Sequence, residues 1–160
     1  MKYFGYGAMS SEEVMEAVIG RRPTGTAGSV AGMRLCIQRI DQVPASAQEV
    51  LRVEWPDSFR SYVTVPDPEA KVAGMVWEVT EDERAIIRDW ELVDLGWFDV
   101  IDVTVREDNG SSVSASTEIL PAGQDYDAEV SGEGYPILLN PREEVLRVAE
   151  KSRLEFLAKR

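Results

Sequence analysis

The chain offers few side chains that could transfer a proton or form a covalent bond at neutral pH, because it has no histidine and a single cysteine. Without histidine, Ser-His-Asp triads, Cys-His pairs and imidazole metal sites are excluded. The lone Cys36 cannot form a disulfide within the chain or a CxxC motif, and its apolar neighbours favour a small core residue over a nucleophile. Any acid–base chemistry must therefore use a carboxylate, a lysine or a tyrosine.

The charge of the chain limits its partners. The sequence holds 17 Lys and Arg residues against 29 Asp and Glu residues, a net charge of -12. Such a surface repels nucleic acid and anionic membranes, so we expect neither as a partner. An anionic ligand would need a local set of backbone N–H groups or a single arginine.

The length of 160 residues fits one domain, which we expect to span residues 1–160. The first residues turn polar too soon for a signal peptide, and no apolar run approaches the roughly 20 residues of a membrane helix. We therefore expect a cytoplasmic protein. Residues 81–83 are three consecutive acids that suit a helix N-terminus better than a metal site, so we expect neither metal nor cofactor. The sequence does not indicate an oligomeric state.

Two helices have clear start signals. Ser10 and Glu13 form the pattern of a capping box, and so do Thr80 and Glu83, whose helix we expect to run to about Glu91. Asn140 followed by proline predicts the start of a last helix, with Asn140 as its N-cap.

The remaining patterns are those of strands. Residues 97–106 and 113–119 alternate around an Asp-Asn-Gly turn, which predicts a half-buried hairpin. Further strands are expected at residues 2–6, 26–40, 50–55, 61–65 and 71–79, with a turn at 66–69. Many strands with a few separate helices predict an α+β fold with a curled or closed mixed sheet.

Five separated segments together resemble the γ-glutamylcyclotransferase-like family. Residues 3–9 (Tyr-Phe-Gly-Tyr-Gly-Ala-Met) resemble its first strand and loop, and residues 71–79 resemble its Val-x-Gly-Val-Val-Trp strand. Residues 89–91 (Asp-Trp-Glu), followed by a Trp-Phe pair at 97–98, resemble the segment with the catalytic glutamate. Residues 27–36 and 134–136 are the other two similar segments. The resemblance implies a small mixed β-barrel with helices packed around it.

The resemblance also implies a reaction, in which the α-amine of a γ-glutamyl compound attacks its own amide carbonyl and releases 5-oxoproline and an amine. Because the substrate supplies the nucleophile, the protein needs only to orient it and to move protons. By the resemblance, Glu91 is the general acid and base. Its place at a helix end between Trp90 and Trp97 would raise its pKa, whereas residue chemistry alone favours a solvated glutamate at the end of a helix.

The resemblance assigns substrate binding to two regions. The turn at Tyr6, Gly7, Ala8 and Met9 would direct backbone amides at the substrate carboxylate, although a tight turn that binds nothing is an equal alternative. Phe98 and Tyr135 would line the pocket. Tyr135 could instead be a partly buried aromatic residue on a loop, with no role in binding.

Some positions differ from the residues that the family more often has. Ala8 and Met9 replace a polar pair, Leu92 replaces a glycine, and Phe98 replaces a tyrosine. These changes indicate a more apolar pocket and a γ-glutamyl amine or other compact amide as substrate. A non-catalytic ligand-binding or structural module that retains the fold, and a hydrolase that uses water, are the alternatives that the sequence leaves open.

Overall fold

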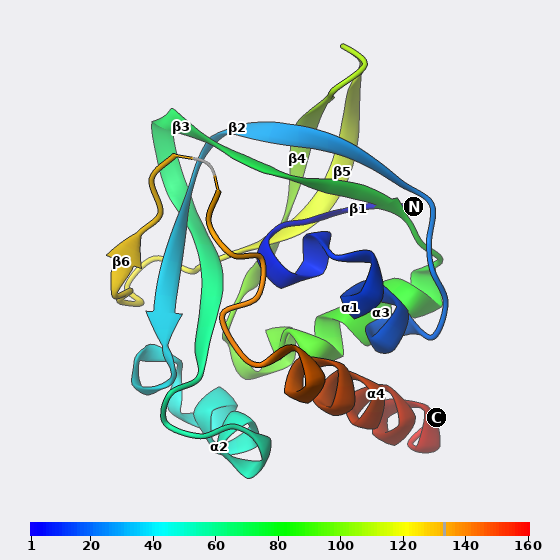
Figure 1. The fold of residues 1–160 in the computed structure, drawn as a ribbon, viewed down its shortest axis with the longest axis vertical. Coiled ribbons are helices and arrows are strands. Elements are labelled where there is room, and N and C mark those ends of the chain that lie inside the picture. The colour runs from blue at the N-terminus through cyan, green and yellow to red at the C-terminus, as the bar shows by residue number, and fades with distance from the viewer. Residues whose placement is uncertain (133) are drawn as a thin grey trace.

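Five strands close into a mixed barrel in the computed structural model, which describes residues 1–132 and 134–160 (Figure 1). They follow the order β3-β1-β5-β4-β2, and β2 pairs with β3 to close the barrel. Among the strand pairs of the described residues, only β1 and β5 run parallel. The strands are β1 (Lys2–Gly5), β2 (Gly25–Arg39), β3 (Arg60–Glu78), β4 (Asp99–Glu107) and β5 (Ser112–Ile119), and a short β6 (Ala128–Glu129) is added to β2. The predicted α+β barrel is confirmed.

The two long strands β2 and β3 pair over almost their whole length. Their register shifts once, from Ala31 opposite Lys71 to Met33 opposite Pro66. The predicted turn at residues 66–69 is therefore wrong, because β3 continues through these residues. The two prolines and Asp67 mark an irregularity in the ladder instead, where extra residues of β3 lie opposite Gly32.

In the described residues, four α-helices accompany the barrel. These are α1 (Glu12–Ile19), α2 (Ala45–Glu54), α3 (Glu81–Trp90) and α4 (Arg142–Ala158). Helix α4 packs against α1 and α3 on one side of the barrel (Figure 1). Three short 3₁₀ segments are η1 (Gly7–Ser10), η2 (Ile40–Gln42) and η3 (Val93–Leu95). Among the described residues, no helix is both long and apolar enough to cross a bilayer.

The alternation of side chains along β1 separates two buried clusters. Phe4 joins the cluster inside the barrel, together with Tyr6 just after the strand, whereas Tyr3 joins the larger cluster between the barrel and the helices, together with Met9 of η1. The site described below lies at the boundary of these two clusters.

Apart from the turn at 66–69, two local predictions are confirmed and three are wrong. The hairpin pairs β4 with β5 around the Asp-Asn-Gly turn, and Thr80 caps α3 through a capping box with Glu83. Residues 50–54 belong to helix α2, whose buried residues Ala47 and Leu51 are four positions apart, as on one face of a helix. Ser11 rather than Ser10 caps α1. The amide of Asn140 bonds the backbone of Arg60, so α4 begins after Pro141 without it.

Candidate active site

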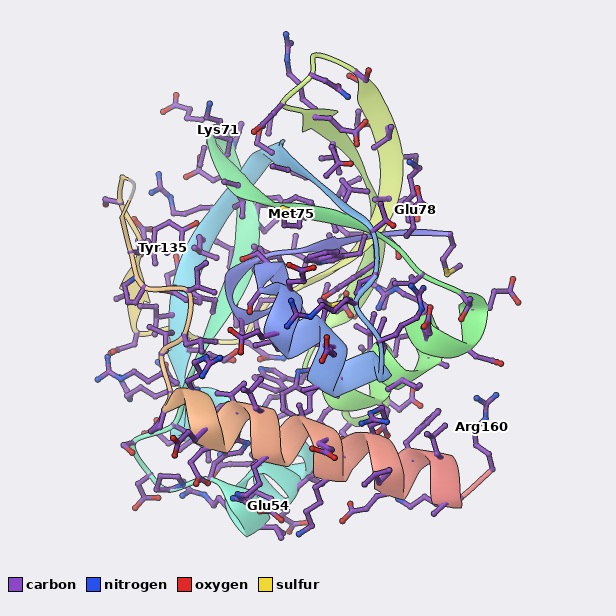
Figure 2. The ribbon with its side chains drawn as sticks, turned by 45° about the vertical axis from the view of Figure 1, so that its right-hand side comes forward. Glu54, Lys71, Met75, Glu78, Tyr135 and Arg160 are labelled. Atoms are coloured by element: carbon purple, nitrogen blue, oxygen red, sulfur yellow. The ribbon has the colours of Figure 1, made fainter. Side chains whose placement is uncertain are left out.

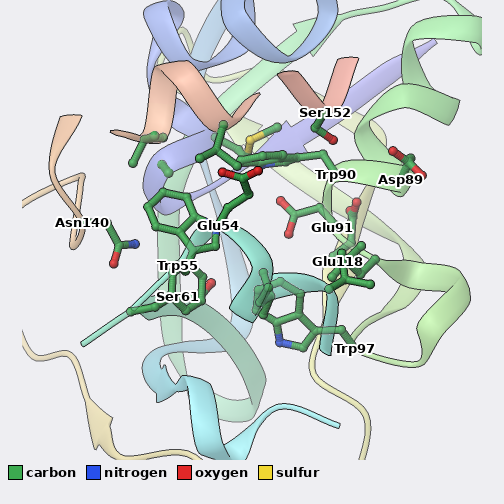
Figure 3. Close-up of a pocket in the computed structure, with 18 of the residues that line it drawn as sticks. Glu54, Trp55, Ser61, Asp89, Trp90, Glu91, Trp97, Glu118, Asn140 and Ser152 are labelled. Atoms are coloured by element: carbon green, nitrogen blue, oxygen red, sulfur yellow. The ribbon is translucent and has the colours of Figure 1, made fainter. Parts of the chain in front are cut away.

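A cavity of about 620 Å³ opens between the barrel and helices α2, α3 and α4 (Figure 3). Its walls combine aromatic side chains with several carboxylates. The lining includes Tyr3, Tyr6, Ala8, Met9, Glu54, Trp55, Phe59, Trp90, Glu91, Leu92, Trp97, Glu118, Val148 and Phe156. The volume is that of a pocket for a small molecule.

Glu91 is the residue at which α3 ends, and its carboxyl is directed into the cavity (Figure 3). The side chain is half-buried and makes no hydrogen bond or ion pair with the described residues. No fully buried side-chain oxygen or nitrogen among those residues lacks a partner, so the carboxyl oxygens of Glu91 must contact the open space of the cavity. Burial and then the charge of Glu118 raise the pKa of Glu91 to about 8, against the opposing effect of Arg84.

The backbone after Glu91 is strained. Leu92 has a φ of 52°, in the left-handed region that residues other than glycine rarely adopt. Its N–H donates to the carbonyl of Asp89 at 3.1 Å, which turns the chain out of α3 and into η3. Leu92, which stands where the resembling family often has glycine, thus has the positive φ that glycine adopts most easily. This turn fixes the direction in which Glu91 leaves the helix.

A buried ion pair lies behind Glu91. Arg84 donates two hydrogen bonds to the carboxylate of Glu118, both at 2.9 Å, and the side chains are 7% and 3% exposed. Arg84 also donates to Ser116. The backbone carbonyl of Glu118 accepts hydrogen bonds from Tyr6 at 2.9 Å and from Thr64 at 3.1 Å. The pair therefore joins α3 to β5 and holds the wall of the cavity in place.

Sequence reasoning missed this pair. The alternation of β5 predicted that Glu118 faces solvent, yet Thr117 and Glu118 are both buried because the helices cover the second face of the strand at its end. Arg84 and Glu118 are 34 residues apart, and no local pattern links them.

The turn after β1 borders the cavity through Tyr6, Ala8 and Met9. Gly7 has a φ of 57°, and a Cβ there would lie 2.7 Å from the ring of Tyr62. The amides of Gly7 and Ala8 begin η1 and have no acceptor among the described residues, whereas the amide of Met9 bonds the carbonyl of Tyr6. The indole of Trp77 donates to the carbonyl of Met9 at 2.8 Å and secures the turn. An anion could therefore bind at the start of η1.

The structure brings together some of the predicted site residues. Glu91, Tyr6, Ala8 and Met9 line the cavity, and Gly7 lies within the same turn.

The other two predicted residues are not part of the lining. Phe98 is buried against Trp97, with ring centroids 4.8 Å apart. Tyr135 is half-buried in the segment before α4 and packs on Tyr62, with ring centroids 5.6 Å apart (Figure 2).

Two other polar side chains that line the cavity are paired within the protein. Glu54 at the end of α2 lies beside α4, where it bonds Lys151 and Arg147 (Figure 2). The indole of Trp97 donates to Gln38 at 2.8 Å. In the part of the chain that the structure describes, no three acidic or cysteine side chains are grouped to hold a metal ion.

Among the comparisons with known proteins, those with solved structures identify the fold. No protein-family model matches the chain, and no curated protein matches it. Solved structures do match. One is named γ-glutamyl cyclotransferase, with 15% identity, a TM-score of 0.62 and coverage of 99% of this chain and 84% of that one.

Two further solved structures are similar. An uncharacterized protein from Homo sapiens has 16% identity, a TM-score of 0.60, and coverage of 99% of this chain and 84% of its own. A protein from Arabidopsis thaliana has 19% identity, a TM-score of 0.57 and coverage of 99% and 88%. The chain therefore has the γ-glutamyl cyclotransferase-like fold that the sequence predicted.

Proposed function

We propose that this protein is a γ-glutamyl cyclotransferase-like enzyme that releases 5-oxoproline from a γ-glutamyl amide or amine, with Glu91 as general acid and base. The observation that carries the proposal is the unpaired Glu91 carboxyl, directed into a cavity that also receives the turn at Ala8 and Met9. A carboxyl that burial makes more basic, in a cleft beside a charged partner, is the pattern of an acid–base residue.

The start of η1 would bind the α-carboxylate of the substrate. The two free amides of Gly7 and Ala8 are uncharged donors, so they can hold an anion within a protein of net charge -12. This contact holds one end of the γ-glutamyl group and leaves its α-amine free to approach its own amide carbonyl. Orientation of this kind supplies effective molarities of about 10⁵–10⁸ M in well-aligned intramolecular reactions.

Glu91 would then move the protons. The α-ammonium must lose a proton before its nitrogen can attack, and a carboxylate with a pKa near neutrality is suited to accept it. The nitrogen–carbon bond forms and the amide carbon–nitrogen bond breaks. The two protons that the ammonium nitrogen loses end on the leaving amine, which departs as an ammonium ion.

The test is a panel of γ-glutamyl amino acids and γ-glutamyl amines, with 5-oxoproline measured as the product. We expect release by the wild-type protein and a loss of kcat of about 10²–10⁴-fold in Glu91→Gln, the range for general acid–base groups. Glu81→Gln is the matched control, because Glu81 is exposed on the first turn of the same helix. Equal rates in Glu91→Gln and wild type would disprove the role of Glu91.

The non-catalytic module remains the second candidate because Ala8 and Met9 bring no polar side chain to the cavity. In that case the panel would yield no 5-oxoproline while the compounds still bind. Trp55, Trp90 and Trp97 line the cavity, so their fluorescence provides the binding measurement.

A further inference from the structure

Tyr3 places a hydroxyl without a partner in the cavity. The residue lies in β1, is only 3% exposed and lines the cavity. Its hydroxyl makes no hydrogen bond with any described residue, in contrast to the hydroxyl of Tyr6, which bonds the carbonyl of Glu118. Every fully buried polar side-chain atom in the described residues has a hydrogen-bond partner. Because the hydroxyl of Tyr3 has none, it is not fully buried, and it belongs to the small part of the side chain that is exposed.

The ring of Tyr3 is held firmly. Its backbone pairs with Trp77 of β3 on one side and with Ser116 of β5 on the other. The guanidinium of Arg84 lies over the ring, 4.6 Å from its centroid, and Arg84 is itself fixed by Glu118. A side chain fixed in this way loses little conformational entropy when a ligand binds its hydroxyl.

The surroundings also fix the chemical form of this hydroxyl. Burial, together with the negative charges of Glu118 and Glu91, holds the pKa of Tyr3 well above its usual range. The hydroxyl is therefore protonated at neutral pH, and it is a neutral hydrogen-bond donor that the protein leaves without an acceptor. The hydroxyl is thus available to donate to an acceptor that a ligand brings into the cavity.

We propose that the Tyr3 hydroxyl donates a hydrogen bond to the carbonyl oxygen of the scissile amide. This inference rests on the proposed function. The α-carboxylate is assigned to the amides of η1 and the protons are assigned to Glu91, so the carbonyl oxygen is the one reacting group without a donor. When the α-amine attacks the carbonyl carbon, the carbonyl π electrons move onto this oxygen, and they return when the leaving amine departs. A fixed neutral donor stabilises that transient negative charge without a reorganisation cost.

Tyr3→Phe tests the inference because it removes only the hydroxyl. We expect kcat to fall about 10²–10³-fold, the range for the loss of one oxyanion donor, with a smaller change in KM. The thermal unfolding temperature should not fall, since the hydroxyl makes no hydrogen bond within the protein. Tyr126→Phe is the matched control, because Tyr126 is exposed and does not line the cavity.

The pH profile separates direct contact from an indirect effect. If Tyr3 contacts the substrate, Tyr3→Phe lowers the rate at every pH and leaves the apparent pKa of the profile in place. A shift of that apparent pKa with an unchanged maximal rate would overturn the inference, because Tyr3 would then act through Glu91. Full activity in Tyr3→Phe overturns it as well, while the proposed function stands. A wild-type protein that releases no 5-oxoproline from any compound overturns both.

Discussion

The cavity and the wall that bounds it, formed by β1, β5 and α3, differ in their hydrogen bonding. Polar groups in the wall bond one another, whereas several polar groups in the cavity have no partner in the part of the chain that the structure describes. In the wall, Arg84 and Glu118 are fully paired, and the carbonyl of Glu118 accepts two further hydrogen bonds. In the cavity, the carboxyl of Glu91, the hydroxyl of Tyr3 and the first amides of η1 have no partner among the described residues.

This contrast distinguishes polar groups that stabilise the fold from polar groups that are available to a ligand. Buried polar groups are normally satisfied within the protein, and those of the wall follow that rule. The three groups named above lie in or beside one cavity, where a ligand could supply their partners. Glu91 and Glu118 therefore make a matched pair: both are acidic and both line the cavity, but we expect one to matter for activity and the other for stability.

The largest expected effect tests the wall. Glu118→Ala leaves the charge of Arg84 buried without its partner, and we expect a loss of about 3–5 kcal/mol in the free energy of unfolding. Glu91→Ala should not lower it, since this side chain has no hydrogen bond or ion pair within the described residues to lose. Urea denaturation measures both.

The double variant Arg84→Met/Glu118→Leu is the control for this prediction. It replaces both charges with apolar groups and should recover most of the stability, because neither charge is left alone. If the two single glutamate variants lose equal stability, the distinction between wall and cavity fails.

The second prediction concerns pH. Because the pKa of Glu91 is raised from 4.5 to about 8 in the folded state, the native protein keeps a proton that the unfolded chain has released between these values. The contribution of Glu91 to stability therefore falls as pH rises through this window. Relative to wild type, Glu91→Gln should gain at least about 1.4 kcal/mol above pH 8, the equivalent of one pKa unit. Parallel stability curves for the two proteins from acid to alkaline pH would contradict the raised pKa.

The smallest expected effect concerns the strained turn that positions Glu91. Leu92→Ala and Leu92→Gly both remove the same side chain, but only glycine relieves the left-handed conformation. We expect the glycine variant to be more stable by about 1 kcal/mol. The comparison of their thermal unfolding isolates backbone strain from packing. A more stable alanine variant would mean that the residue leaves this conformation in solution.

The sequence predicted the elements whose signals are local. The Asp-Asn-Gly hairpin and the capping box at Thr80 depend on residues a few positions apart, and both are confirmed. The prediction failed at residues 50–54. This short apolar stretch was assigned to a strand, but it is the end of helix α2, which buries Ala47 and Leu51 on one face. The prediction also failed at residues 66–69, because the long ladder with β2 carries β3 past two prolines that usually end a strand.

The candidate site shows the same division. By itself, the sequence determined that no histidine or nucleophilic pair is available, and its motifs singled out Glu91 and the turn after β1. Only the tertiary structure decided that Arg84 meets Glu118, that Tyr3 keeps a free hydroxyl in the cavity, and that Phe98 and Tyr135 lie outside its lining. The physical reason is that residue type fixes which chemistry is possible, whereas burial and pairing depend on contacts between segments far apart in the chain.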